Sequence, residues 1–224
     1  MTPGVLRASW LLARKDLVLE LRSRELALAM ALFAACASVL FHYAAPDASP
    51  RVAIGLLWVT VVLVAILAFV RSFARERDEE LLAALVLAPI DRAAIWAAKA
   101  LVASVLLVLV EVIALPLVWL LFLQGASAPV PDAGVVVLAL ALADVGLAAG
   151  GSLVASLASA SRQREVLLPV LFLPLALPLT IAGVAACNAS ATGGGVARPL
   201  GLVLLYDAVV AVLAYGVYEH VVTE

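Results

Sequence analysis

The sequence has little of the side-chain chemistry that enzymes and metal sites require. Its 224 residues include two cysteines and two histidines, and 13% of the chain is charged. Cys36 and Cys187 form no CxxC or CxxCH pattern, so both are expected to be small buried hydrophobic residues. The sequence shows no catalytic triad, no ligand spacing for a metal and no basic surface for nucleic acid. We therefore predict neither an enzyme nor a metal site.

A phosphate-binding loop is also missing. The glycines Gly193, Gly194 and Gly195 lack the following Lys-Ser/Thr of a Walker-type loop, and we interpret them as a flexible link. The chain is not expected to bind ATP itself. Any ATP-driven work therefore requires a nucleotide-binding partner.

What the sequence has in abundance is hydrophobicity, with 66% hydrophobic residues and a mean hydropathy of +1.19. The apolar residues gather into runs of about 20 residues, the length that crosses roughly 30 Å of hydrocarbon. This pattern predicts an all-α integral membrane protein with six transmembrane helices. The predicted spans are 26–45, 52–70, 101–123, 134–158, 166–187 and 200–218.

The basic residues are divided unevenly between the two predicted sides. Twelve of the 14 lysines and arginines precede the first span or follow the second and fourth, whereas Arg51 and Arg198 lie in the other connections. Because Lys-rich and Arg-rich connections stay in the cytoplasm, both termini are predicted to be cytoplasmic. His42 and His220 then lie on opposite sides and cannot share a metal or haem. His42 alone stays open as an axial ligand.

Residues 1–25 are predicted to form an amphipathic helix outside the spans, and residues 26–224 a single transmembrane domain. Apolar side chains recur at helical spacing in the first segment, with basic residues on its other faces. Such a helix lies along the inner membrane surface. It is interpreted either as an elbow helix at the rim of a transporter or as a simple anchor. The apolar residues are Leu6, Trp10, Ala13, Leu17 and Leu21.

The segment 71–99 separates the second and third spans and is too polar to enter a bilayer. Alternating charges precede a helix-period apolar stripe, and Pro89 ends that helix because a proline disfavours helix in the residue before it. Asp91 then caps a helix running from Arg92 through Lys99 into the third span. We interpret the segment as a cytoplasmic coupling helix on which a separate motor protein pushes. Its coupling residues are Glu76, Glu79, Glu80, Leu81, Leu82, Leu85, Pro89 and Asp91.

Three acidic residues, Glu111, Asp144 and Asp207, lie inside predicted spans. A charge at mid-bilayer costs at least about 2.5–3.5 kcal/mol on insertion scales, so these residues are functional candidates. No lysine or arginine within a span neutralises them, so each is protonated, hydrogen-bonded, hydrated or matched by a partner protein. Glu111, near Pro116, is the strongest candidate, whereas Asp144 and Asp207 are expected nearer the outer surface.

Two further patterns concern how the helices pack. Gly146 and Gly150 have the spacing that lets another helix approach closely, either within this chain or from another subunit. Pro169, Pro174 and Pro178 each remove a backbone hydrogen bond from the fifth span. That span is predicted to be bent or broken, as a moving hinge or as a static kink.

These features together resemble a known family. The segment 76–99, with its LxxLxxAPIDR pattern, resembles the inner loop of ABC-2-type permeases. The whole chain resembles the CcmB family, the haem-exporter permeases of bacterial cytochrome c maturation, through the stretches 12–25, 55–59, 71–92 and 164–186. One departure is Glu79-Glu80-Leu81-Leu82, where the family often has Gly-Ser/Thr-Leu-Glu at the start of the inner helix.

The resemblance implies a permease subunit in the bacterial inner membrane, with ATP bound by a separate CcmA-like ATPase. It further implies a haem-handling CcmC-like membrane partner, and it makes a small single-span subunit and a haem chaperone candidate partners. Haem is then the ligand that the complex transports or handles, not a cofactor of this chain. Three alternatives stay open: a general ABC-2 exporter, a proton-coupled secondary carrier that uses the three acids, and a scaffold that moves no substrate.

Overall fold

The computed structural model describes residues 5–78, 92–159 and 163–221, and within them every regular element is a helix. Six of these helices are long and apolar enough to cross a membrane, which confirms the predicted all-α membrane fold. The elements are α1 (Val5–Ser23), α2 (Glu25–Ala44), α3 (Pro50–Asp78), α5 (Arg92–Val118), η1 (Trp119–Leu123), α6 (Ala133–Ser159), α7 (Arg164–Ala191) and α8 (Ala197–Val221).

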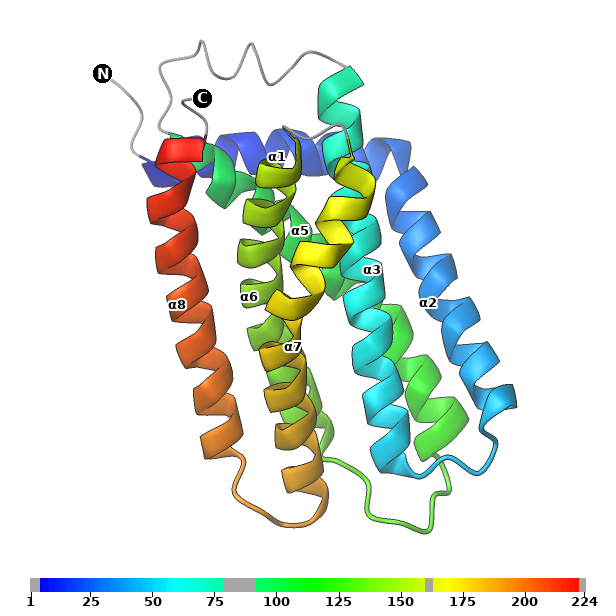
Figure 1. Ribbon diagram of the computed structural model, residues 1–224. Helices are drawn as coiled ribbons and strands as arrows, with labels where there is room; N and C mark the ends of the chain where they lie inside the picture. The colour runs from blue at the N-terminus through cyan, green and yellow to red at the C-terminus, as the bar shows by residue number, and fades with distance from the viewer. Residues whose placement is uncertain (1–4, 79–91, 160–162, 222–224) are drawn as a thin grey trace.

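The first helix, α1, crosses one end of the bundle, and α8 ends at this same end (Figure 1). The chain turns from α1 into α2 at Arg24, whose φ of 57° is uncommon for a residue other than glycine. The Arg24 N–H donates to the Glu20 carbonyl at 2.8 Å and closes the end of α1. Ala13 is buried against the bundle, whereas Trp10 is 58% exposed, so the predicted apolar stripe is divided between the bundle and the outside.

The centre of the bundle is α6, which contacts α3, α5, α7 and α8. The α2 and α8 helices lie at opposite edges (Figure 1) and expose many leucines and valines, as expected of helix faces that meet lipid. Cys187 is buried as predicted. Cys36 is exposed, so the prediction for it was wrong: α2 packs along one face only, and Cys36 lies on another.

Two spans are longer than their apolar runs indicated. The third span covers Ala93–Leu123, or 31 residues, which corresponds to about 46 Å of helix and exceeds the hydrocarbon thickness. Its last turn, η1, is a π-helix that follows Pro116. The α7 helix continues to Ala191, and Gly193, with a φ of 70°, forms the turn after it. The connection between the fifth and sixth spans is therefore shorter than the predicted span bounds, 187 and 200, imply.

The three prolines of the fifth span all lie inside α7. The helix is continuous from Arg164 to Ala191, so the alternative of a broken helix was wrong. The helix is nevertheless bent: its first part, drawn in yellow, is inclined to the remainder (Figure 1). Proline is a common cause of such bends, since it removes a hydrogen bond and its ring pushes against the preceding turn.

Candidate functional site

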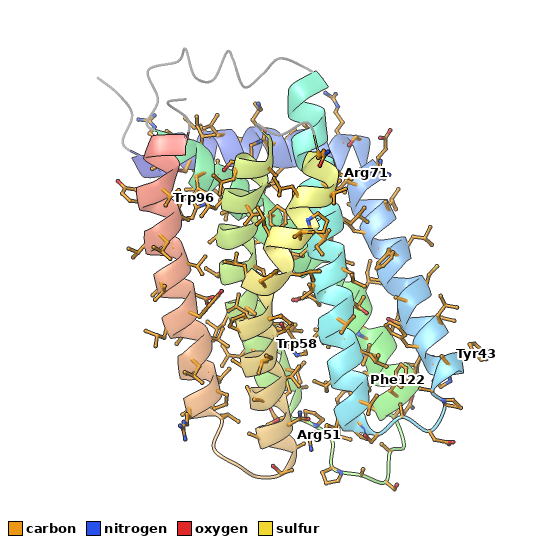
Figure 2. All side chains as sticks on the ribbon, viewed as in Figure 1. Tyr43, Arg51, Trp58, Arg71, Trp96 and Phe122 are labelled. Atoms are coloured by element: carbon orange, nitrogen blue, oxygen red, sulfur yellow. The ribbon has the colours of Figure 1, made fainter. Side chains whose placement is uncertain are left out.

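The two helices that flank the predicted coupling helix reach the same end of the bundle as α1. The α3 helix continues to Asp78 and α5 begins at Arg92. Figure 2 shows Arg71 at this end of α3 and Arg51 at the other end. Glu76 lies in α3, near its end. The other predicted coupling residues lie outside the described residues: Glu79, Glu80, Leu81, Leu82, Leu85, Pro89 and Asp91.

An ion pair joins α1 to the first turns of α5. The Lys99 Nζ lies 2.8 Å from Asp16 Oδ2, and Lys15 lies 3.2 Å from Asp16 Oδ1. The Lys99 and Asp16 side chains are only 12% and 19% exposed, so little water screens their interaction. Movement of α5 at this end must therefore carry α1 with it or break the pair. No pattern in the sequence indicates this partnership, because the two residues lie far apart in the chain.

A second contact joins the same end of α5 to α6. The indole Nε1–H of Trp96 donates to the Ala149 carbonyl at 3.1 Å. Figure 2 shows Trp96 at the end of the bundle that carries α1. Because α6 lies at the centre of the bundle, this bond links the start of α5 to the central helix.

The three intramembrane acids all lie near the middle of their helices and are nearly buried. Asp144 is the twelfth residue of the 26-residue span Ala133–Ala158, and Asp207 is the eleventh of the 21 residues in Ala197–Val217. Their exposed fractions are 2% and 7%, against 6% for Glu111. Along their helices Asp144 and Asp207 are therefore close to the midpoint, and the expectation that they lie nearer the outer surface stays a prediction.

The structure brings two of the acids together and leaves the third apart. The Glu111 carboxyl on α5 and the Asp144 carboxyl on α6 lie beside each other, and neither Asp144 oxygen has a donor among the described residues. Asp207 on α8 instead lies against Gly146, on another face of α6, where a Cβ in place of the glycine hydrogen would overlap Asp207 Oδ1. The acids therefore form a pair and a separate single residue.

The glycines show why the helices around α6 approach so closely. A Cβ on Gly146 would meet Leu179 of α7 as well as Asp207, and one on Gly150 would overlap Leu175 of α7. Both helices that face this pair therefore belong to the same chain. Two further close contacts were not predicted: Gly151 faces the Phe69 ring, and Gly183 faces the Trp58 ring.

The match to a known family covers almost all of this architecture. The family model described as CcmB protein matches residues 7–222. The chain belongs to the CcmB family. Among curated proteins, none matches the chain. Family membership makes this chain a membrane permease subunit of the ABC-transporter type, in the haem transport of cytochrome c maturation. The resemblance seen in the sequence is confirmed.

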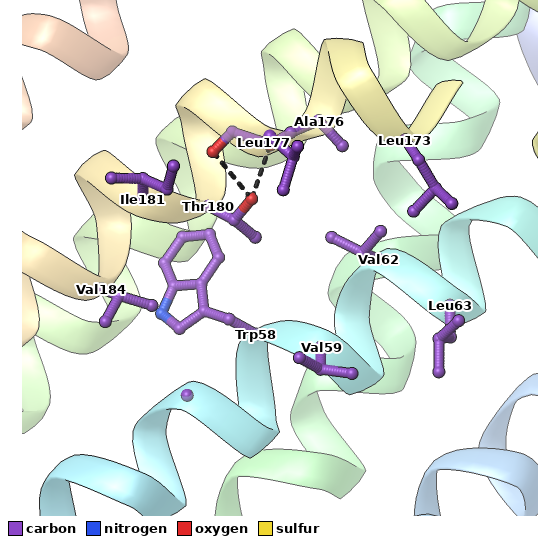
Figure 3. A pocket seen from close by; sticks show the side chains of 11 residues that line it. Trp58, Val59, Val62, Leu63, Leu173, Ala176, Leu177, Thr180, Ile181 and Val184 are labelled. Atoms are coloured by element: carbon purple, nitrogen blue, oxygen red, sulfur yellow. Dashed lines mark hydrogen bonds between the residues drawn. The ribbon is translucent and has the colours of Figure 1, made fainter. Parts of the chain in front are cut away.

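The CcmB-family chain has an apolar groove of about 370 Å³ between α3 and α7. Figure 3 shows the Trp58 ring of α3 reaching under α7, beside Thr180 and Val184. The Thr180 hydroxyl donates to the Ala176 and Leu177 carbonyls, so its polarity is satisfied within α7. No side chain that commonly ligates haem iron lines the groove. The apolar side chains that line this groove suit contact with a hydrocarbon chain.

At the end of the bundle opposite α1, His42 of the CcmB-family chain packs edge-on against Phe122 of η1, with ring centroids 5.4 Å apart. Its Nδ1 is buried and accepts or donates no hydrogen bond within the described part of the chain. No group of three metal-binding side chains occurs among the described residues. The aromatic contact explains the position of His42, and an axial-ligand role stays a prediction.

Beside the bend of α7, the Tyr206 hydroxyl of α8 donates to the Leu175 carbonyl at 2.9 Å. Tyr206→Phe removes only this bond between the two helices. We expect a loss of about 1 kcal/mol in the free energy of unfolding, the usual net value of one hydrogen bond. Thermal unfolding in detergent measures it. Tyr215→Phe, at a side chain that is 48% exposed, is the matched control. Equal losses in both variants would contradict the tethering role.

Proposed function

We propose that this permease subunit receives the stroke of a separate CcmA-like ATPase through the segment 71–99, and that the stroke drives haem delivery on the outer side. The observation that carries the proposal is the convergence of four features at one end of the bundle. The ends of α3 and α5 that flank residues 79–91, the helix α1, the end of α8 and most of the described basic residues lie there. By the positive-inside rule this end faces the cytoplasm of a bacterial inner membrane, where ATP is available.

The contacts around α5 supply a route for the stroke. When the ATPase pair closes on ATP, a docked coupling helix moves the ends of α3 and α5 that flank it. The Asp16–Lys99 pair transmits the displacement to α1, and the Trp96–Ala149 bond transmits it to α6. A ligand-driven change of this kind requires the ATP-bound partner to favour one arrangement of the helices over another.

The remaining parts of the proposal concern partners. A CcmC-like membrane protein holds haem, and the ATPase cycle releases the haem-loaded chaperone outside the membrane. A small single-span subunit completes the complex. In this scheme haem is the handled substrate, and this chain converts movement into release. That role accords with the groove between α3 and α7, whose described lining residues include none that commonly ligates haem iron.

The test of the proposal is the coupling helix itself. Leu85→Asp places a charge in the predicted docking surface, and we expect the amount of ATPase that co-purifies with the chain to fall by about tenfold or more, since desolvating an unpaired charge at an interface is costly. Pro89→Ala, which removes the predicted end of that helix, should have the same direction of effect. Leu85→Met, which keeps the apolar surface, is the matched control. Wild-type recovery of the ATPase with both Leu85→Asp and Pro89→Ala would overturn the proposal.

A further inference from the structure

The paired carboxyl groups of Glu111 and Asp144 lie apart from the Asp16–Lys99 and Trp96–Ala149 contacts that carry the proposed stroke. We propose that they form a proton-binding site, which holds a single proton shared between the two groups across the interface of α5 and α6. This assignment does not depend on the ATPase, on haem or on the orientation of the chain. It concerns the resting state of the bundle.

The geometry of the pair requires a proton. Asp144 is 2% exposed and Glu111 is 6% exposed. Neither Asp144 oxygen accepts a hydrogen bond from a donor in the described part of the chain, and the same holds for Glu111 Oε1. The two carboxyls instead face each other within hydrogen-bonding range. Ionised carboxylates are acceptors only, so their contact is attractive only when one carries a proton and donates it to the other.

No other charge of the described bundle offsets the pair. Along α3 no ionisable side chain lies between Arg51 and Arg71, and α7 carries Arg164 and Glu165 in its first turn and Cys187 near its other end. The basic and acidic residues of α1 lie at one end of the bundle, and the ionisable residues of α2 lie at its two ends apart from Cys36, which is exposed. On α8, Tyr206 bonds to α7 and Asp207 faces Gly146. Two neighbouring carboxylates without a cation favour sharing one proton, as in acid dyads of known enzymes.

The position of the pair gives the proton a mechanical consequence, which rests on the proposed function. The α5 helix begins at Arg92, within the segment 71–99, and α6 is the centre of the bundle. A shared proton bonds these two helices at mid-span, deeper in the bundle than the Trp96–Ala149 contact. Loss of the proton replaces that bond by repulsion between two carboxylates. The pair therefore decides whether α5 and α6 move together.

The proton can be counted by infrared spectroscopy of the full chain in lipid nanodiscs at neutral pH. A protonated carboxyl has a carbonyl stretching band that an ionised carboxylate lacks. We expect Glu111→Gln to remove one carboxylic acid per chain from the difference spectrum, and Asp144→Asn to remove one as well. In each variant the new amide donates to the remaining carboxylate and replaces the shared proton. The double variant should therefore remove the same single acid, not two.

The controls separate this site from other acids and from misfolding. Asp207→Asn must leave the band of the pair in place, and every variant must elute as a monodisperse species on size exclusion. Removal of two acids by the double variant would show two independently protonated groups and overturn the shared proton. The shared proton would also be overturned if no carboxylic acid band disappeared in both single variants. Because the measurement needs neither ATPase nor haem, its failure is distinct from a failure of the coupling test.

Discussion

Alanine in place of Gly151 is expected to destabilise the bundle by about 1–3 kcal/mol, the usual cost of overpacking a core. The added Cβ would overlap the Phe69 ring, which is 2% exposed. That ring cannot simply move aside, because it packs against Phe172, with ring centroids 5.4 Å apart. The substitution therefore forces α3 and α6 apart at a point where α7 also packs. Thermal unfolding in detergent at fixed pH measures the loss.

The matched control is the same substitution at Gly201 of α8, where an added Cβ meets nothing within 4 Å. Alanine in a helix is favoured over glycine by roughly 0.5–1 kcal/mol, so Gly201→Ala should be neutral or slightly stabilising. A rescue variant sharpens the comparison: Phe69→Leu combined with Gly151→Ala should recover part of the loss. If Gly151→Ala and Gly201→Ala unfold at the same temperature, the close packing of α6 against α3 does not limit the stability of the bundle.

The fold was largely predictable because a bilayer restricts the solutions. A span must be long, apolar and internally hydrogen-bonded, so hydropathy alone located six helices. The predicted bounds were less accurate where polar residues are accommodated within a helix. The Ser190 hydroxyl donates to the Cys187 carbonyl at 2.7 Å, which lets α7 continue through a stretch that looked like a loop. Similarly, the pair with Asp16 lets Lys99 lie inside a helix counted as part of a span.

Partnerships between helices were not predictable, because they depend on how each helix is rotated. Glu111 and Asp144 were each recognised as unusual, yet nothing in one sequence says that α5 and α6 turn them toward each other. The four-residue spacing of Gly146 and Gly150 revealed a close-packing face of α6, whereas Gly183 has no glycine four residues before or after it. Its close contact becomes visible only when the Trp58 ring of α3 is seen against it. Rotation is set by the sum of packing contacts, which no local pattern contains.

Reversing the charge of Asp16 is expected to have a large effect on stability at the end of the bundle that carries α1. Asp16→Lys places a third ammonium beside Lys99 and Lys15, in a site where the Lys99 side chain is only 12% exposed. Breaking a fully buried pair costs about 3–5 kcal/mol, and we expect about 3 kcal/mol here because the site is partly open to water. The α1 helix should detach from α5, which thermal unfolding and faster proteolysis within α1 would both report.

The charge-swapped chain, with Asp16→Lys and Lys99→Asp together, separates the pair from its individual charges. If the contact between α1 and α5 causes the loss, the swap should restore most of the stability that Asp16→Lys removes. The same three chains also distinguish the two interpretations of α1. An elbow helix that transmits the stroke predicts that Asp16→Lys retains bound ATPase but loses haem delivery, and that the swap recovers delivery. A simple anchor predicts that delivery falls only as far as the amount of chain in the membrane falls.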